Sequence, residues 1–420
     1  MIQPKTTHID TGDTFSHTRQ LSPEKTAVIL AGGIEEFLAH GYAATSMDRI
    51  ATVAGVSKAT VYSHFQDRES LFIALIEQLV RGKFRSLFNP RPEDLQTEPR
   101  IFLSKLASRF LDLGANEPQF LDFMRVLIGE SGRFPQLARA FVQNVELTSV
   151  EMLHQYLATY ARLKLADPEA TARIFLGAVV YFLIIQEILH GQDIVSMTRD
   201  RLINNLVDLI LRSAEDSIPL TIPKEPRQLS PEKSEAILSG GMQEFLVNGY
   251  AATSMDRVAT AAGVSKATIY SHFQDKEGLF TALVQQLVQG EFRSLFNPSA
   301  EEVAPEPRIF LSELANRLFD LAATDPQFLN FMRVIIGESG RFAQLAQAFV
   351  RNTEQTSFWM VHQYLNSWDR LKLVDPEATA RIFIGAIVHF LIVQEMLHGA
   401  DIVPMARDRL INNLLDLILG

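Results

Sequence analysis

The sequence contains no cysteine among its 420 residues. This excludes disulfide-bonded scaffolds, thiolate metal sites, iron–sulfur clusters and cysteine nucleophiles. It also lacks a long hydrophobic run, because the longest apolar stretches, residues 175–185 and 383–393, are shorter than the roughly 20 residues of a membrane-spanning helix. The first twenty residues are polar, without the apolar core of a signal peptide. We therefore expect a cytoplasmic protein with no membrane partner.

Catalytic and metal-binding patterns are missing as well. The sequence has no phosphate-binding loop, nucleophile elbow or paired-carboxylate pattern, so we expect no enzyme and no cofactor. His154, His190, His362 and His398 lack metal-ligand spacing, which predicts no metal site. Basic charge is scarce, since 39 Lys and Arg face 49 Asp and Glu for a net charge of −10. This argues against non-specific coating of nucleic acid, but not against a local DNA-reading surface.

The main feature that is present is a tandem duplication. Residues 21–212 align without a gap with residues 229–420 at a constant offset of 208, and 136 of the 192 positions, about 71%, are identical. Each unit has the size of a domain, whereas solenoid repeats span roughly 20–50 residues. Between the units, residues 213–228 contain three prolines and no helical periodicity, which predicts an extended linker.

Helical periodicity runs through each unit. Ser22 is the expected N-cap of an opening helix that ends at Gly41, and Thr45 and Asp48 form a capping-box pattern before a short helix. No segment alternates as a strand would, so we expect an all-α fold. The other expected helices begin at Ser57 and Asp67 and lie near residues 99–115, 117–128, 134–160, 168–190 and 197–212.

Residues 41–65 form a helix-turn-helix pattern, repeated at residues 249–273 with three changes. Gly55 permits the tight turn between two short helices. Val61 and Phe65, four positions apart, are expected to pack inward, which leaves short and polar side chains facing out, as a helix in a DNA major groove requires. Ser57 and the free amides of its helix N-terminus suit a phosphate.

Three short motifs carry a family resemblance. The start Gly-Tyr-x-x-Thr-Ser-Met, the turn Ala-Gly-Val-Ser-Lys-Ala-Thr and the end Tyr-Ser-His-Phe, followed by Asp-Arg-Glu-Ser-Leu-Phe, closely resemble the tetracycline-repressor (TetR) family. The resemblance covers both units almost entirely. The segments 124–134 and 332–342 look like the AefR-like branch of that family.

The resemblance implies two TetR-like units, each with a three-helix DNA-binding domain and a larger helical domain for a small molecule and for dimerisation. We expect an N-terminal tail at 1–20, DNA-binding domains at 21–66 and 229–274, a linker at 213–228, and ligand-binding and dimerisation domains at 67–212 and 275–420. The DNA contacts that the resemblance and the pattern assign are Thr45, Ser46, Ser57, Lys58, Ala59, Thr60, Tyr62 and His64, and Thr253, Ser254, Ser265, Lys266, Ala267, Thr268, Tyr270 and His272.

The effector pocket is expected among aromatic and methionine side chains of the larger domains, although at helical spacing the same residues suit a hydrophobic core equally well. Wide apolar faces on residues 175–189 and 201–211 predict that the two units pack through a four-helix bundle. The candidates for an apolar effector are Phe110, Phe123, Met124, Phe141, Met152 and Tyr156, and Phe331, Met332, Phe349, Met360 and Tyr364.

Two functions are consistent with these patterns. One is an effector-responsive repressor whose two units form a pseudo-dimer on a near-palindromic operator of double-stranded DNA. The other is a small-molecule or partner-binding helical protein with a non-functional helix-turn-helix. The DNA-reading segments differ at only 3 of 25 positions, against 9 of 20 in residues 141–160, which favours the repressor. The latter differences, Glu151 against Trp359 above all, predict two effector pockets that are not equivalent, unless they reflect drift on an exposed helix face.

Overall fold

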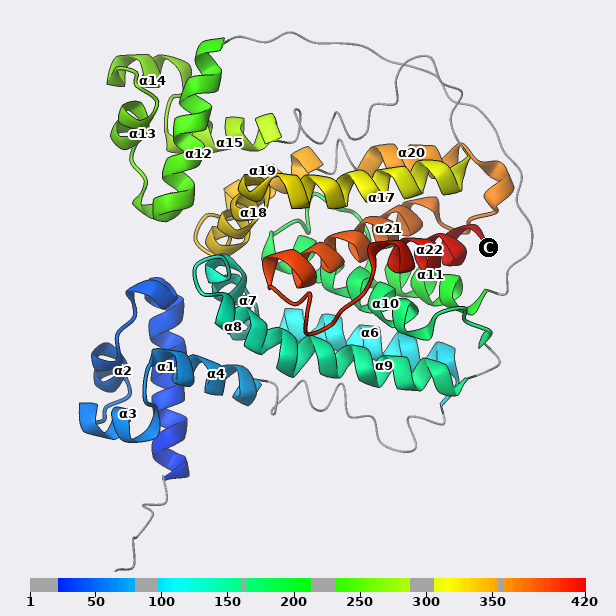
Figure 1. Ribbon diagram of the computed structural model, residues 1–420, viewed down its shortest axis with the longest axis horizontal. Coiled ribbons are helices and arrows are strands. Elements are labelled where there is room, and N and C mark those ends of the chain that lie inside the picture. The colour runs from blue at the N-terminus through cyan, green and yellow to red at the C-terminus, as the bar shows by residue number, and fades with distance from the viewer. Residues whose placement is uncertain (1–21, 80–96, 161–162, 213–231, 288–305, 354–357) are drawn as a thin grey trace, which may run out of the picture.

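The computed structural model describes residues 22–79, 97–160, 163–212, 232–287, 306–353 and 358–420. Within these ranges every regular element is helical, so the expected all-α class is confirmed. The predicted tail and linker lie outside the described residues. Two small helical heads project from the same side of a larger helical body, and each head belongs to one unit (Figure 1).

Each head contains three helices, and a fourth leads from it toward the body. Ser22 caps the first helix as expected, because its Oγ accepts a hydrogen bond from the amide of Lys25 at 3.4 Å. The helical conformation breaks at Gly41 as expected, where φ is +75°, and one more helical turn follows this kink. The helices are α1 (Pro23–Ala44), α2 (Met47–Val53), α3 (Lys58–His64) and α4 (Arg68–Leu79), matched by α12 (Glu232–Ala252), α13 (Met255–Ala261), α14 (Lys266–His272) and α15 (Lys276–Leu287).

The body is formed by the remaining helices of both units. The helix expected over 134–160 is divided by a π-helical turn, Val142–Glu146, and the one expected over 168–190 ends in a second, Ile184–Ile188. The first unit contributes α6 (Pro99–Asn116), α7 (Pro118–Glu130), α8 (Pro135–Phe141), α9 (Leu147–Thr159), α10 (Pro168–Leu183) and α11 (Arg199–Leu211). The second contributes α17 (Pro307–Thr324), α18 (Pro326–Glu338), α19 (Ala343–Thr353), α20 (Trp359–Asn366), α21 (Pro376–Leu391) and α22 (Arg407–Leu419).

The two units pack mainly through α10 against α21, and α11 and α22 complete a four-helix arrangement. The backbones of α10 and α21 approach closely, because a Cβ at Gly177 would lie 2.9 Å from the Cα of Ala386. A second crossing joins α7 to α18, where a Cβ at Gly129 would lie 2.8 Å from the Cα of Gly337. Glycine is required at both crossings because any side chain would push the helices apart.

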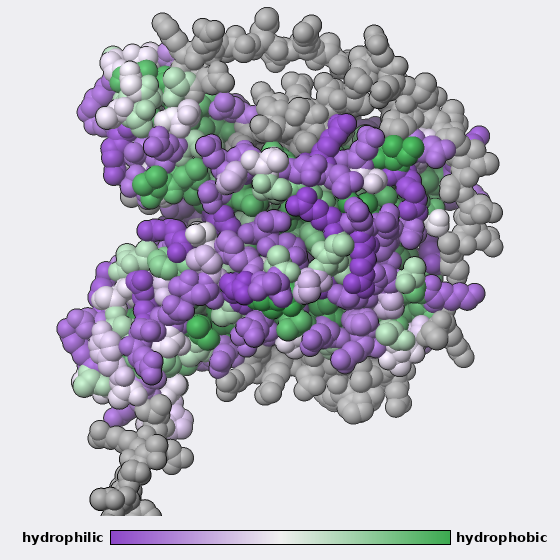
Figure 2. All heavy atoms as spheres, viewed as in Figure 1, coloured by the Kyte–Doolittle hydropathy of each residue, from purple (hydrophilic) through white to green (hydrophobic). Residues whose placement is uncertain are grey.

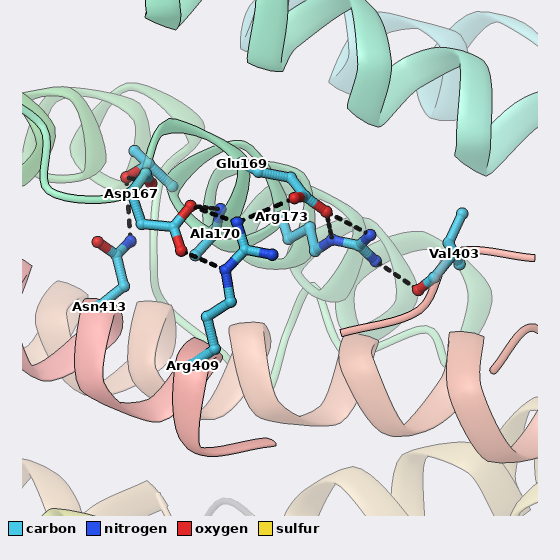
Figure 3. A network of polar contacts seen from close by, with 8 residues as sticks. Asp167, Glu169, Ala170, Arg173, Val403, Arg409 and Asn413 are labelled. Carbon is cyan, nitrogen blue, oxygen red and sulfur yellow. Dashed lines mark hydrogen bonds and ion pairs between the residues drawn. The ribbon is translucent and has the colours of Figure 1, made fainter. Parts of the chain in front are cut away.

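Reciprocal polar contacts border the α10–α21 contact (Figure 3). Asn413 donates a hydrogen bond to the hydroxyl of Thr171 at 3.0 Å, and Asn205 makes the same bond to Thr379 at 3.0 Å. Arg409 donates to the carboxylate of Asp167 at 2.9 Å, as Arg201 does to Asp375. Because each contact recurs with the units exchanged, the two halves are related by an approximate two-fold axis, as in an isologous dimer interface.

Two helical segments are long and apolar enough to cross a membrane, Pro168–Ile188 and Pro376–Met396. The sequence-based expectation that no segment has this length was wrong, because each helix extends beyond its apolar run. In both segments 83% of the most apolar window is buried inside the protein, since these are the central helices of the contact between the units. Buried core helices of a soluble protein have this same composition.

Candidate functional site

The helix-turn-helix of each head is held by local contacts. Ser46 caps α2 by accepting a hydrogen bond from the amide of Arg49 at 3.3 Å, and Ser57 caps α3 by accepting one from the amide of Thr60 at 3.1 Å. Gly55, with a φ of +66°, makes the turn between them. Val61 is fully buried and fixes α3 on the core of the head. The second head repeats these caps with Ser254 and Ser265.

The exposed face of α3 carries most of the predicted DNA contacts. Lys58, Ala59 and Tyr62 are exposed, and the Tyr62 side chain is unusual for an aromatic residue in being 52% exposed. Thr60 is half-buried, and its hydroxyl is 2.8 Å from that of Ser57. In α14 Lys266, Ala267 and Tyr270 are likewise exposed and Thr268 is half-buried. Each head thus presents a short polar helix with a protruding tyrosine to solvent.

Thr45 and Thr253 do not belong to this face. Each is only 3% exposed, and their hydroxyls donate to the carbonyls of Gly41 and Gly249 at 2.9 Å. The expectation of a phosphate contact from these side chains needs correction, because the hydroxyl is buried and fastens the chain after the kink. The adjacent Ser46 and Ser254 are exposed at helix N-termini.

The two predicted histidines differ between the heads. Nδ1 of His64 is 2.9 Å from the hydroxyl of Thr26 on α1, and the ring is half-buried. His272 is exposed, and its Nδ1 is 3.1 Å from the carbonyl oxygen of Thr268 on its own helix. The same residue type is therefore available to a ligand to a different extent in each head.

The first residue of α3 and of α14 is a lysine, and each of these recognition helices is joined by that lysine to the preceding helix through an ion pair. Lys58 pairs with Asp48, and Lys266 pairs with Asp256. All four side chains are at least half exposed. Residues 21–66 and residues 229–274 each carry a net charge of −1, but the sequence did not show that an aspartate contacts the lysine. The ammonium group that is predicted to contact DNA is thus partly neutralised in both heads.

An aromatic cluster joins each head to the body. The ring of Tyr42 contacts Phe72 at 5.2 Å and Phe134 of the body at 4.5 Å, with the guanidinium of Arg68 4.2 Å above it. Burial raises the pKa of Tyr42, an effect that Arg68 opposes. Phe123 stacks on Phe72 at 5.0 Å. Phe123 therefore belongs to the junction of head and body rather than to an effector pocket, and Phe331 beside Phe280 occupies the matching place.

The second unit contains an apolar cavity of about 90 Å³. Among the predicted effector residues, Met332 and Phe349 line it. Tyr364 does not, because its ring stacks on Phe310 at 3.9 Å within the core, and Met360 is half-buried away from the cavity lining. The remaining lining comes from Leu318, Phe328, Leu329, Ile336, Thr353, Phe358, Ile384, Val388, Leu391, Ile392 and Met396, together with Tyr181, Ile184, Ile185 and Leu189 of the first unit.

The predicted pocket residues of the first unit separate in the same way. Phe110, Met124 and Phe141 occupy the positions of cavity-lining residues of the second unit. Tyr156 is a core residue, since it stacks on Phe102 at 3.8 Å and its hydroxyl donates to the carbonyl of Thr97 at 2.9 Å. Met152 matches Met360 and is also half-buried. Helical periodicity alone did not separate the residues at cavity-lining positions from those of the core.

Glu151 and Trp359 were expected to shape the two pockets, and this was wrong. Glu151 is exposed and Trp359 is 56% exposed, so this difference lies on the outer helix face. Two other differences in the same segments do reach the cavity, namely Thr353 and Phe358, where the first unit has Val145 and Val150. The sequence did not predict that Tyr181 and its neighbours line the cavity of the other unit. Their apolar helix face indicates burial but does not show which unit it packs against.

Comparison with known proteins agrees with this geometry. The family model described as bacterial regulatory proteins, tetR family, matches residues 29–75 and 237–283. The model described as the AefR-like transcriptional repressor, C-terminal domain, matches residues 102–213 and 310–420. The chain belongs to the TetR family. It is a DNA-binding transcriptional regulator in which both family domains occur twice.

Known TetR regulators match one unit at a time. The chain is 25% identical over 161 residues to the HTH-type transcriptional regulator AcrR of Shigella flexneri, covering 38% of this chain and 74% of AcrR. It is also 25% identical over 174 residues to the regulator YhgD of Bacillus subtilis, covering 40% of this chain and 88% of YhgD. The solved structure of the flavonoid-responsive regulator FrrA is 27% identical, covers 45% of this chain and 94% of FrrA, and has a TM-score of 0.37.

Proposed function

We propose that a single chain acts as an effector-responsive repressor in the cytoplasm, with its two units forming an intramolecular pseudo-dimer on one operator. The observation that carries this proposal is the identity of the exposed faces of α3 and α14. The two helices differ only at Val61 and Ile269, and both of these side chains are fully buried. Two surfaces with the same side chains are expected to read the same bases, so the operator has two alike half-sites.

The proposed DNA contacts are the predicted residues that the heads expose to solvent. Lys58, Tyr62 and the N-termini capped by Ser46 and Ser57 would contact phosphates, as would His64, while Ala59 and Thr60 approach base edges. The second head uses Ser254, Ser265, Lys266, Tyr270 and His272 in the same way, with Ala267 and Thr268 at the bases. Phosphate contacts fix the register of each helix, and the base contacts carry the sequence information.

Because both units belong to one chain, a single chain can bind the operator without associating with a second chain. The polar contacts between α10, α11, α21 and α22 repeat with the units exchanged, as a dimer interface requires. Covalent connection makes pairing of the units intramolecular, at an effective concentration on the order of millimolar. A small apolar molecule in the body would act as effector by favouring an arrangement of the heads that does not fit the operator.

Selection of binding sites from a random DNA pool tests this proposal. We expect one site per chain, with two similar half-sites whose centres are about one helical turn, or a multiple of it, apart. Sedimentation of the protein–DNA complex should give one chain per operator at nanomolar concentration. Unrelated half-sites, or complexes that contain only two chains per operator, would contradict the proposal.

A further inference from the structure

Each head rests on a turn of the body that is bonded to the opposite unit. The turn after α18 begins at Ser339 and leads to Phe342, whose ring contacts Tyr250 of the second head at 4.6 Å. Ser339 is only 1% exposed, and Nε2 of His190 in the first unit donates a hydrogen bond to its carbonyl oxygen at 3.0 Å. The hydroxyl of the same serine accepts a hydrogen bond from Nε of Arg125, also in the first unit. The first unit therefore fixes the turn that contacts the second head.

The same arrangement recurs with the units exchanged. Nε2 of His398 donates to the carbonyl oxygen of Ser131 at 3.1 Å, and Nε of Arg333 donates to the hydroxyl of Ser131. Ser131 is 1% exposed and begins the turn that leads to Phe134 and its contact with Tyr42 of the first head. Each group of one histidine, one arginine and one serine is called a latch here, and the two latches are His190, Arg125 and Ser339, and His398, Arg333 and Ser131.

The histidines of the latches have a strained backbone. His190 has a φ of +54° and His398 a φ of +55°, in the left-handed region that residues other than glycine rarely adopt. Such a conformation persists only where the surrounding structure enforces it. Here the opposite unit also binds each histidine carbonyl, because Gln347 donates to that of His190 at 3.2 Å and Arg139 to that of His398 at 2.9 Å. Each strained histidine is thus bonded to the other unit at two points.

We propose that the two latches set the distance and angle between the heads and thereby determine which half-site spacing the chain accepts. This inference rests on the proposed binding of one operator by one chain, and it names the residues that select the operator's geometry. Each added base pair moves a half-site by about 3.4 Å and turns it by about 35° around the DNA axis. Heads with fixed attachment points match one spacing, whereas loosely attached heads accept several.

The four-helix contact between the units is less suited to this role. It holds the units together, but α11 and α22 lie at the end of the body that is remote from the heads (Figure 1). The latches instead lie on the turns that contact the heads themselves. Loss of the latches should therefore loosen the heads without separating the units.

Two double variants remove the latches and keep the fold. Ser131→Ala with Ser339→Ala deletes the hydroxyls that accept hydrogen bonds from the buried arginines. His190→Gly with His398→Gly deletes both imidazole rings, and glycine adopts the left-handed backbone without strain. The two variants thus break the same latches through different atoms.

A matched control removes contacts of the same kind away from the heads. Thr171→Val with Thr379→Val deletes two hydroxyls that accept buried hydrogen bonds from Asn413 and Asn205 of the opposite units. Chemical denaturation should show that this control loses as much stability as the serine variant. A difference in head position between the two is then not a consequence of stability.

The distance between the heads is measurable without DNA. Because the chain has no cysteine, Thr52→Cys and Thr260→Cys place one spin label at an exposed position of α2 and one at the same position of α13. Double electron–electron resonance should give a narrow distance distribution in the parent and in the control, and a broader one in both latch variants. A broad distribution in the parent, or an unchanged one in the latch variants, would overturn the proposal.

Spacing preference is the second measurement. Fluorescence anisotropy with a selected operator, and with base pairs inserted between its half-sites, gives the ratio of affinities for the preferred and the altered spacing. This ratio should fall by about tenfold in the latch variants, as expected for loss of a hydrogen bond to a charged group, and should stay at the parent value in the control. An unchanged ratio in the latch variants would contradict the latch role and leave the proposed function intact. If the parent binds no operator with two half-sites, the proposed function fails, and the spin-label distances alone decide whether the latches position the heads.

Discussion

Nε of Arg125 in the first unit donates a hydrogen bond to Oγ of Ser339 in the second at 3.0 Å, and the exchanged pair, Arg333 and Ser131, has the same bond at 2.9 Å. Both arginines are only 7% exposed. They lie on α7 and α18, the helices that also contact the heads. The buried polar contacts between the units therefore lie on the same helices that meet the heads. On the face shown in Figure 2 the two heads protrude from the body with a hollow between them.

Removal of Arg125 should destabilise this contact. Its guanidinium also donates to the carbonyls of Glu187 and Ile188 at 2.9 and 3.1 Å, so Arg125→Ala leaves buried acceptors unpaired. We expect a loss of about 1–3 kcal/mol in the free energy of unfolding, measured by chemical denaturation. Arg133→Ala, at an exposed arginine eight residues later, should stay within about 0.5 kcal/mol of the parent. If both variants change the free energy of unfolding equally, the buried hydrogen bonds of Arg125 contribute nothing to stability.

Asp48→Asn and Asp256→Asn should strengthen DNA binding irrespective of sequence. Each releases a recognition-helix lysine from its ion pair, so that its ammonium becomes free for a phosphate. Conversely, Lys58→Ala and Lys266→Ala should each reduce the slope of log affinity against log salt by roughly 1. Stability should hardly change, because exposed ion pairs contribute about 0–1 kcal/mol.

Glu35→Gln is the control for the aspartate variants, since it removes the same charge from an exposed position on α1. Fluorescence anisotropy at several salt concentrations with operator and with unrelated DNA provides the measurement. If Glu35→Gln strengthens binding as much as Asp48→Asn, net charge rather than the ion pair sets the affinity.

Arg341→Ala should weaken the link between effector and DNA. Arg341 follows α18, which lines the cavity, and its guanidinium donates to the carbonyl of Ala39 in the head of the first unit at 2.9 Å. Its counterpart Arg133 instead pairs with Glu130 of its own unit at 3.8 Å. We expect the ratio of operator affinities with and without effector to fall by about two- to thirtyfold in Arg341→Ala. Arg133→Ala should retain the parent ratio, and the same fall in both would refute a specific role for Arg341.

Acid should destabilise the fold through His389. Burial lowers the pKa of His389 below its usual 6.5; Arg173 lowers it further, and Glu146 opposes both. The unfolded chain therefore takes up a proton near pH 6.5, while the folded chain does so only at lower pH. The stability contribution of neutral His389 is complete above pH 6.5 and is lost as pH falls toward the folded pKa.

The melting temperature measured between pH 7.5 and 5 tests this effect. It should fall less steeply for His389→Gln than for the parent chain. Part of the slope should remain, because burial also lowers the pKa of His190 and His398. Identical slopes in the variant and the parent would show that His389 is not responsible.

Much of the fold and of the DNA-reading surface was predictable because it depends on neighbours in sequence. Ser57 was recognisable as a cap since a cap bonds an amide three residues away. The capping-box pattern placed the cap of α2 one residue too early, at Thr45, whereas Ser46 caps that helix. Gly55 marked the turn for a similar local reason. Thr45 was misplaced because its burial depends on the path of the chain after the kink at Gly41, and the helical pattern does not give that path.

By itself, the sequence determined the duplication, the helices and their caps, and the family of the chain, because each depends on residues a few positions apart or on direct identity between the units. Only the tertiary structure decided which side chains meet across the two units. Tyr181 lines the cavity of the second unit and His389 pairs with Glu146, contacts that join positions far apart in the chain. An apolar helix face predicts burial but not its partner, since periodicity carries no information about the direction in which two packed helices cross.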